Sequence, residues 1–380
     1  MISPFLLIYS LYKSEFSKDK IIQIIKCLVL TICLVIIISN LFEFSLGTYS
    51  NVTIKANFFD WFNPNSTNVY TDLASKGFFQ YGNQTSAILI MFLPFMIYNV
   101  FKKLNFMNYF TLICNVFALI LLCTKVAVIG VAIAFIYSLF VFAFIHIIQK
   151  KKLNFKICIP ILIVLILYGA LLPKNPMFSR INESSNVIAE FDKEHQPSLP
   201  KVPDSEVKIS AEDMIQYIEN TYNSKKVPKQ FLLENYPYKY DPEFWYNFLQ
   251  QDISLTMDYR YTECSMIKRI VEVNNNPMDK LFGITNTRLQ NVFNIERDFV
   301  VQYYALGIVG LLLVFAPYFA ILIVFAYKTL KEKFKNLTIV NSLACITIVF
   351  LFGTSYMSGN LLNSLSFTIY FTICFYLIRR

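Results

Sequence analysis

The chain has 380 residues, of which 56% are hydrophobic and 17% aromatic, and its mean hydropathy is +0.48. This is more apolar material than one soluble core needs, so the composition excludes a soluble globular domain and indicates a polytopic membrane protein. The net charge of +9 does not indicate a nucleic-acid partner, because the basic residues lie in short links between apolar runs rather than on one soluble patch.

Nearly all of the eight cysteines lie within the apolar runs of the sequence. Only Cys264 lies outside the apolar runs, and neither a Cys-x-x-Cys motif nor a His-rich metal spacing occurs. We therefore expect no disulfide framework in the soluble part, no thiol- or imidazole-bound metal and no cofactor.

Apolar runs of about 18 to 25 residues, the length of a helix that crosses about 30 Å of hydrocarbon, recur along the chain. They predict spans near 21–42, 84–101, 106–123, 126–148, 155–173, 300–327, 338–357 and 361–378, with a shorter apolar piece at 2–12. The expected fold class is an all-α polytopic membrane protein with about eight or nine transmembrane helices and one large, mostly helical extracellular loop domain. Three regions follow: an N-terminal transmembrane bundle at 1–173 with an outer loop at 43–83, the extracellular loop domain at 174–299, and C-terminal transmembrane helices at 300–380.

Lysine and arginine residues predict the orientation, because cytoplasmic links are enriched in them. They occupy every second link, at 13–20, 102–103, 150–156, 328–335 and 379–380. The alternate links, at 43–83, 124–125, 174–299 and 358–360, are then outside. Met1 also falls on the outer side, which suggests an upstream helix that this chain lacks.

Polar residues gather where the outer links meet the spans. Lys76 and Asn83 stand immediately before the span 84–101, in an aromatic stretch typical of a membrane interface. Lys125 follows Thr124 in a turn so short that the flanking spans must be antiparallel neighbours. A lone border lysine often anchors a helix to headgroups, whereas an isolated cation on the outer face runs against the positive-inside rule. Both an anchor and a substrate contact therefore stay open for Lys125.

The long outer segment 174–299 passes through a Pro- and charge-rich stretch before its helices begin. The sequence predicts three helices, which begin near Ser210, Asp241 and Asp258. Within the charged stretch, 189–208 is expected to be mobile. A segment this long is uncommon as a passive connector, which favours a functional domain or lid.

The stretch 277–311 brings charge to within one helical turn of a membrane span. In order, it contains Gly283, Arg288, the triplet Glu296, Arg297 and Asp298, and then Gly307 and Gly310. Charges at a membrane border are costly to keep there, so they mark either a functional site or an anchoring collar. With Arg260 of the third loop helix, these cations and carboxylates suit a phosphate-bearing substrate and a proton transfer.

Four segments, from about Lys76 onward, share a pattern of motifs. The first is a Gly-aromatic-x-Asn stretch in GFFQYGNQTSAILIMFLP, and the second is a Thr/Ser-Arg/Lys-x-Ala motif in LLCTKVAVIG. The third is an Arg followed by a Pro and a Leu-Phe-Gly turn, in YRYTECSMIKRIVEVNNNPMDKLFGI. The fourth is a polar pair before Gly-Ile-x-Gly-Leu, in NIERDFVVQYYALGIVGLL. Together they resemble, in the same order, the O-antigen ligase and O-antigen polymerase superfamily, and its Gram-positive members in particular. All four are predicted to reach the outer face.

The resemblance implies a membrane glycosyltransferase that polymerises or ligates surface glycan at the outer face. Its donor would be an undecaprenyl-pyrophosphate-linked glycan, its acceptor a hydroxyl group, and neither a metal nor a nucleotide sugar would be required. It would be a multi-pass protein of the bacterial cytoplasmic membrane with the large loop outside, in contact with the bilayer and with other surface-polysaccharide assembly proteins.

The resemblance also assigns roles to residues. Glu296 or Asp298 would accept the acceptor's proton, Lys125, Arg260 and Arg288 would bind the pyrophosphate, and Lys76, Asn83 and Arg297 would contact other parts of the substrate. Many members carry a His in the segment aligned to 296–298, where this chain has none. Many also carry Arg in place of Lys125, so bidentate phosphate recognition becomes a point-charge contact here.

Other interpretations of the same residues stay open. Arg297 could pair with Glu296 or Asp298 as a collar, and Arg260 could be an exposed helix residue. A polysaccharide flippase or exporter of the same lipid-linked glycan is the alternative function, although exporters place polar residues within spans or show internal repeats. A receptor or sensor is less consistent with the sequence, since the inner links are too short for an output module.

Overall fold

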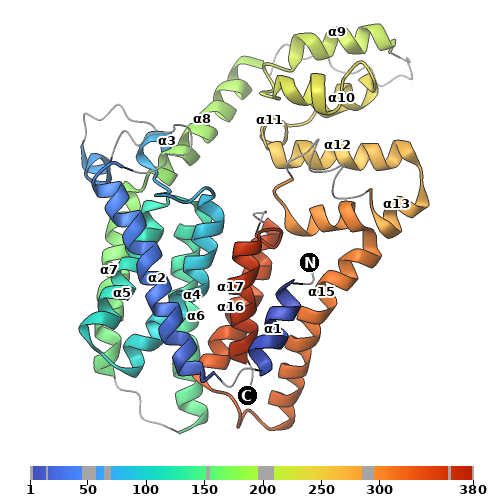
Figure 1. Cartoon of the computed structure of the whole chain (residues 1–380). Coiled ribbons are helices and arrows are strands. Elements are labelled where there is room, and N and C mark those ends of the chain that lie inside the picture. Colours follow the sequence, from blue (N-terminus) through green and yellow to red (C-terminus); the bar gives the residue numbers. More distant parts are fainter. Residues whose placement is uncertain are drawn as a thin grey trace. The chain divides into compact units, whose positions relative to one another are not determined.

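A computed structural model of the chain describes residues 3–13, 16–44, 57–63, 70–150, 155–195, 209–284, 295–357 and 361–378. Within these ranges the regular structure is entirely helical, with no strand, which confirms the all-α prediction. The chain forms two compact units, shown in Figure 1, which we describe separately. Unit 1 comprises Met1–Arg180 and Phe315–Arg380, and unit 2 comprises Ile181–Val314.

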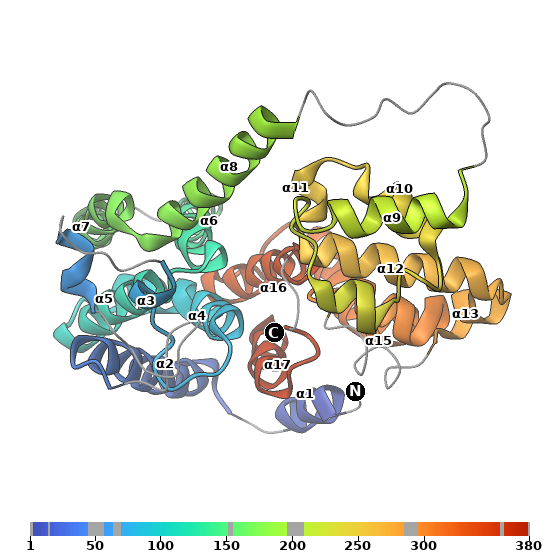
Figure 2. The ribbon, with the colours of Figure 1, turned by 90° about the horizontal axis from the view of Figure 1, so that it is seen from above.

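Unit 1 is a bundle of apolar helices around α4 (Gly82–Lys102), which is buried along most of its length. Helices α2 (Lys18–Leu41), α5 (Phe106–Leu121) and α6 (Lys125–Ile148) pack around it, as the view from above in Figure 2 shows. The other elements of this unit are α1 (Ser3–Lys13), η1 (Phe58–Phe62), α3 (Tyr70–Leu73), α7 (Phe155–Leu171), η2 (Leu172–Lys174), α16 (Ile339–Met357) and α17 (Leu365–Ile378).

Among the described residues, five helices are long and apolar enough to cross a membrane, namely α2, α4, α6, α15 (Asp298–Lys331) and α16. Helix α7 and the start of α8 (Pro176–His195) meet at a bend of 41° and give a sixth span if they count as one. At 16 and 14 residues, α5 and α17 are apolar but short of about 30 Å at 1.5 Å per residue. A multi-pass membrane protein is therefore confirmed, whereas the count of eight or nine spans is not.

The shortened α5 has a local cause. The predicted span 106–123 included two more residues, but the backbone of Cys123 is left-handed (φ 50°), which ends the helix after Leu121. The amide of Cys123 then donates to the carbonyl of Ile120, and Thr124 already caps the next helix. Turn geometry thus removes residues that hydropathy alone assigns to the membrane.

Helix α8 is a correction to the predicted loop. The sequence placed the first loop helix near Ser210, but α8 already covers Pro176–His195, and residues 196–208 of the stretch expected to be mobile lie outside the described residues. Asn175 accepts the amide of Met177 through its side chain, and Pro176 occupies the first helical position, where its missing N–H costs nothing. The proline therefore begins a helix rather than interrupting one.

Unit 2 contains the three predicted loop helices, and all three are confirmed. They are α9 (Ala211–Thr221), α10 (Pro242–Leu249) and α12 (Tyr259–Asn274). The side chains of Ser210, Asp241 and Asp258 each accept a backbone amide from the first turn of the helix that follows. The shorter elements are η3 (Phe231–Asn235), α11 (Ile253–Thr256) and α13 (Pro277–Phe282).

Helices α9, α10 and α12, with η3, share one hydrophobic core around the fully buried Trp245. The core also includes Ile295, Val301 and Ala305, which flank or follow the charge triplet. The start of α15 is therefore packed into the core of unit 2, which holds the charge triplet in place.

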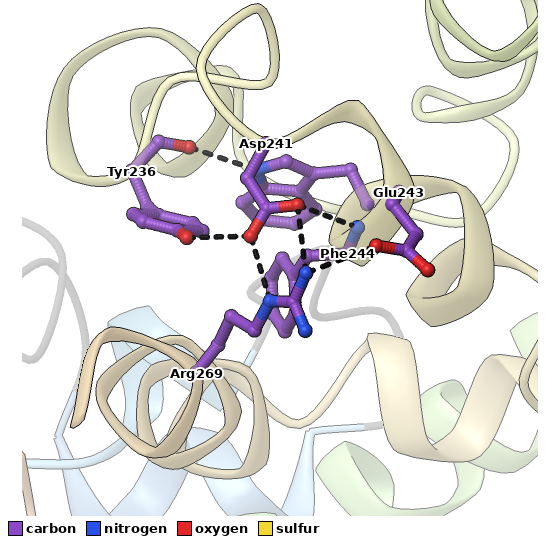
Figure 3. A network of polar contacts seen from close by, with 6 residues as sticks. Tyr236, Asp241, Glu243, Phe244 and Arg269 are labelled. Carbon is purple, nitrogen blue, oxygen red and sulfur yellow. Dashed lines mark hydrogen bonds and ion pairs between the residues drawn. The ribbon is translucent and has the colours of Figure 1, made fainter. Parts of the chain in front are cut away.

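A buried polar network joins α10 to α12 within this core, as Figure 3 shows. Asp241 accepts the amide of Phe244, the hydroxyl of Tyr236 at 2.7 Å and Nε of Arg269 at 2.7 Å. Arg269 also reaches Glu243 at 3.2 Å. Although burial opposes it, hydrogen bonds from Arg269 and Tyr236 hold the pKa of Asp241 below its ordinary value of 3.8. The network fixes α12, which carries Arg260 in its first turn, against the rest of unit 2.

Candidate functional site

The first turn of α12 faces the residues that precede α15. Nε of Arg260 donates to Oε2 of Glu296 at 2.7 Å, and its terminal nitrogen contacts the same oxygen in an ion pair. The two side chains are 34% and 38% exposed, so this pair is open to solvent on one side. The structure thus joins a predicted phosphate ligand to a predicted proton acceptor that lies 36 positions away in sequence.

A second, longer ion pair lies beside the first. Arg297 approaches Asp258 at 3.8 Å, and Asp258 also accepts the amide of Arg260 as the cap of α12. The collar interpretation paired Arg297 with Glu296 or Asp298, and the structure shows Asp258 instead. Asp258 was missed as a site residue, although its position two residues before Arg260 and its capping role were readable from the sequence.

Asp298 differs from Glu296 in its access to solvent. It is the first residue of α15 and is completely buried, whereas Glu296 is partly exposed. A carboxylate at a helix N-terminus is stabilised by the amide dipoles of the first turn. The burial of Asp298 favours a structural role at the start of α15 and leaves Glu296 as the carboxylate that an incoming molecule can reach.

Two glycines bring the Leu-Phe-Gly turn against α15. Gly283 (φ 76°) and Gly307 (φ 66°) both have backbone conformations that favour glycine, and Gly307 interrupts the helix geometry of α15. A Cβ on Gly283 would lie 2.4 Å from the backbone of Ala305, and one on Gly307 would lie 2.2 Å from that of Leu281. The amide of Ile284 donates to the carbonyl of Tyr304 at 2.8 Å across this contact. We call this contact the glycine seam.

The seam explains why two motifs separated in sequence occur together. Each glycine leaves room for the other segment's backbone, so neither position tolerates a side chain without a shift of main-chain atoms. It also fixes the first turns of α15, and with them the approach of Glu296 to Arg260.

Unit 1 contains three of the predicted residues, Lys76, Asn83 and Lys125, at or near the N-terminal ends of α4 and α6. The hydroxyls of Ser86 in α4 and Thr124 before α6 are hydrogen bonded at 2.8 Å, which brings these two helix ends together. Thr124 also accepts the amide of Ala127 and so caps α6. Lys125 is the first residue of α6 and is exposed.

Lys76 and Asn83 lie near the start of α4. Nζ of Lys76 donates to the carbonyl of Gln80 at 3.2 Å, and Asn83 is the second residue of α4 and is half-buried. Together with Lys125 they form a polar end of unit 1. Arg288 lies outside the described residues.

The described part of the chain gathers no group of three or more His, Cys, Asp or Glu side chains able to hold a metal ion. The two polar groups are instead built from cations, amides and carboxylates. Such side chains can bind an anionic oxygen and accept a proton from a neutral hydroxyl.

Comparison with known proteins agrees with the motif pattern. The family model described as O-antigen ligase like membrane protein matches residues 1–379, almost the entire chain. No curated protein matches the chain, and no solved structure matches it. The match confirms the resemblance from the motifs and supports a role in membrane glycan ligation by a glycosyltransferase-type enzyme. The chain therefore belongs to the family of O-antigen ligase like membrane proteins.

Proposed function

We propose that this protein transfers a glycan from a polyprenyl-pyrophosphate carrier, of the undecaprenyl type, to an acceptor hydroxyl at the outer face of the bacterial cytoplasmic membrane. The observation that carries the proposal is the ion pair between Arg260 and Glu296 in unit 2, where Glu296 lies two residues before the helix α15. A guanidinium suits a diphosphate, and a carboxylate suits the proton of the attacking hydroxyl.

The ion pair sets the order of events. Arg260 exchanges Glu296 for a diphosphate oxygen when the donor binds, because a diphosphate carries more charge and more acceptor oxygens than one carboxylate. Glu296 is then free to accept a proton. Donor binding therefore prepares the base, and without donor the carboxylate stays occupied.

The transfer step balances with these two residues. The bond between the sugar's anomeric carbon and the diphosphate oxygen breaks, and its electron pair stays on the diphosphate, where Arg260 stabilises the developing charge. The acceptor oxygen forms the new bond to the anomeric carbon, and its proton goes to Glu296. The proton then leaves to solvent, which regenerates the carboxylate.

Lys125 has a physical reason to hold an anion. A cation on the first residue of a helix faces the positive end of the helix dipole, which is unfavourable unless an anion lies nearby. The first-turn amides of α6 attract the same anion. We assign Lys125 and Arg288 to the pyrophosphate, and Lys76, Asn83 and Arg297 to other parts of the substrate. Asp298 has a structural role as the first residue of α15.

The surface glycan of a strain that lacks the gene tests this function. Short, single-repeat glycan would identify a polymerase, and full-length glycan left on its carrier would identify a ligase. Repeat units retained on the cytoplasmic face would contradict the proposal, since that result is expected for an exporter. Re-expression of the parental chain should restore the glycan, whereas Glu296→Gln should not restore it at equal abundance in the membrane.

A further inference from the structure

Helix α13 exposes an apolar face in unit 2. Met278, Leu281 and Phe282 are 54%, 41% and 60% exposed in the part of the chain that the structure describes. Their spacing of three and four residues places them on one side of the helix, with the exposed Lys280 between them in sequence. Three large apolar side chains on a six-residue helix are costly to leave in water.

The glycine seam fixes where this face lies along α15. The backbone of Leu281 and Phe282 packs against Gly307, and that of Ala305 and Leu306 packs against Gly283. Figures 1 and 2 both show α13 beside this part of α15. The apolar face is therefore held level with Gly307.

Gly307 also lies near the start of the apolar run of α15, which follows Gln302. The residues that follow it in unit 2 include Ile308, Val309, Leu312 and Leu313, all of which are exposed and apolar. They belong to α15, one of the helices in the described chain that are long and apolar enough to cross a membrane. Exposed apolar residues on such a helix are those that lipid covers.

We propose that α13 is an interfacial helix, and that its apolar face is covered by bilayer lipid at the boundary between headgroups and acyl chains beside α15. Continuity with the membrane-spanning part of α15 identifies the occupant, because the seam places α13 at the level where that part begins. Helical spacing places Lys280 on the side of α13 opposite Met278, Leu281 and Phe282, where a lysine can be attracted to the headgroups of anionic lipid. An interfacial helix of this kind buries its apolar face by about 5–10 Å.

Through the seam, the depth of α13 fixes the level of the first turns of α15. The inference does not depend on the proposed chemistry, because it concerns only lipid contact.

Depth-dependent fluorescence quenching tests the contact. The full-length Phe282→Trp protein is reconstituted in vesicles of phosphatidylcholine and phosphatidylglycerol. The signal of the native Trp61 and Trp245 is measured with the parental protein and subtracted. We expect the added emission to be blue-shifted and to lose most of its intensity with lipids brominated near the carbonyl end of the acyl chain. Lipids brominated at the chain terminus should quench it less.

Tyr240→Trp is the matched control, because Tyr240 is 72% exposed in the same unit and is far in sequence from α15. Its emission should be red-shifted and unquenched by either lipid. Met278→Trp provides a second probe of the α13 face if Phe282→Trp fails to fold. Red, unquenched emission from α13 would mean water contact, and blue, unquenched emission would mean a protein partner or a second copy of the chain; either result overturns the proposal.

Discussion

The exchange at Arg260 predicts an unusual response to one substitution. Glu296→Gln removes the carboxylate with which a diphosphate competes for Arg260. Because both side chains are about one-third exposed, the pair contributes about 1 kcal/mol rather than several. Glu296→Gln should therefore bind a prenyl diphosphate about fivefold more tightly than the parental protein. Its glycan transfer should fall about 10²- to 10⁴-fold, because the proton acceptor is gone.

A double-mutant cycle of Arg260 and Glu296 distinguishes the exchange of partners at Arg260 from a general effect of charge on diphosphate binding. Arg260→Gln should weaken diphosphate binding by about 2 kcal/mol, or about thirtyfold, because a charge-assisted hydrogen bond is lost. In the Arg260→Gln background, Glu296→Gln should give no tightening, since no guanidinium remains to be released. Asp258→Asn is the matched control: it removes a carboxylate of the same cluster and keeps the helix cap, but it frees Arg297 rather than Arg260.

The assay is the affinity of the purified full-length protein for farnesyl pyrophosphate, measured by calorimetry in nanodiscs, alongside transfer in membranes with lipid-linked donor. The exchange is refuted if Glu296→Gln leaves the affinity unchanged, or if Asp258→Asn tightens binding as much. The proposed function itself is refuted by a different result, namely an Arg260→Gln protein that binds diphosphate and transfers glycan like the parent.

Three further predictions use other parts of the chain. Lys125→Gln should slow glycan transfer about a hundred- to a thousandfold without loss of membrane insertion, which is the effect of removing one hydrogen-bond donor that stabilises a transition state. Lys125→Arg should retain activity. If Lys125→Gln transfers glycan at nearly the parental rate, Lys125 is only a membrane anchor. Gly283→Ala should destabilise unit 2 by about 3 kcal/mol in thermal unfolding, because the added Cβ would meet backbone atoms and Gly283 has a positive φ. The control Gly353→Ala should have little effect, because the space around Gly353 is open. Asp241→Asn keeps the α10 cap but should lower stability at neutral pH by about 2 kcal/mol, because Arg269 loses one of its two carboxylate partners and keeps only Glu243. The pKa of Asp241 is depressed in the folded state, so the stability that its charge contributes is present above its ordinary pKa of 3.8 and is lost as pH falls below that value. On acidification, only the parental protein should therefore lose the stability difference that separates it from Asp241→Asn.

Local patterns were enough to predict the helical class and the main loop helices. Hydropathy identified the apolar segments, because a helix in lipid must satisfy its backbone internally and cover itself with apolar side chains. Capping chemistry identified α9, α10 and α12, because Ser210, Asp241 and Asp258 each act on amides only two or three residues away. The motif order identified the family, which the match over residues 1–379 confirms.

Helix ends were less predictable than helix existence. The sequence could not show that the left-handed backbone of Cys123 ends α5, or that Pro176 begins α8 instead of interrupting it. Both depend on a backbone conformation that hydropathy and composition do not encode. The turn at Cys123 is the reason why α5 is shorter than the apolar run that predicted it.

Only the tertiary structure decided how the charged residues combine. Arg260, Glu296, Arg297 and Asp298 were all readable as candidates, but their pairing depends on the packing of α12 against the start of α15 by way of Ile295 and Val301. Burial separated Asp298 from Glu296, although the two carboxylates are two residues apart in sequence. The seam between Gly283 and Gly307 joins segments 24 residues apart, and no local pattern records that contact, because the space each glycine leaves is filled by another segment's backbone.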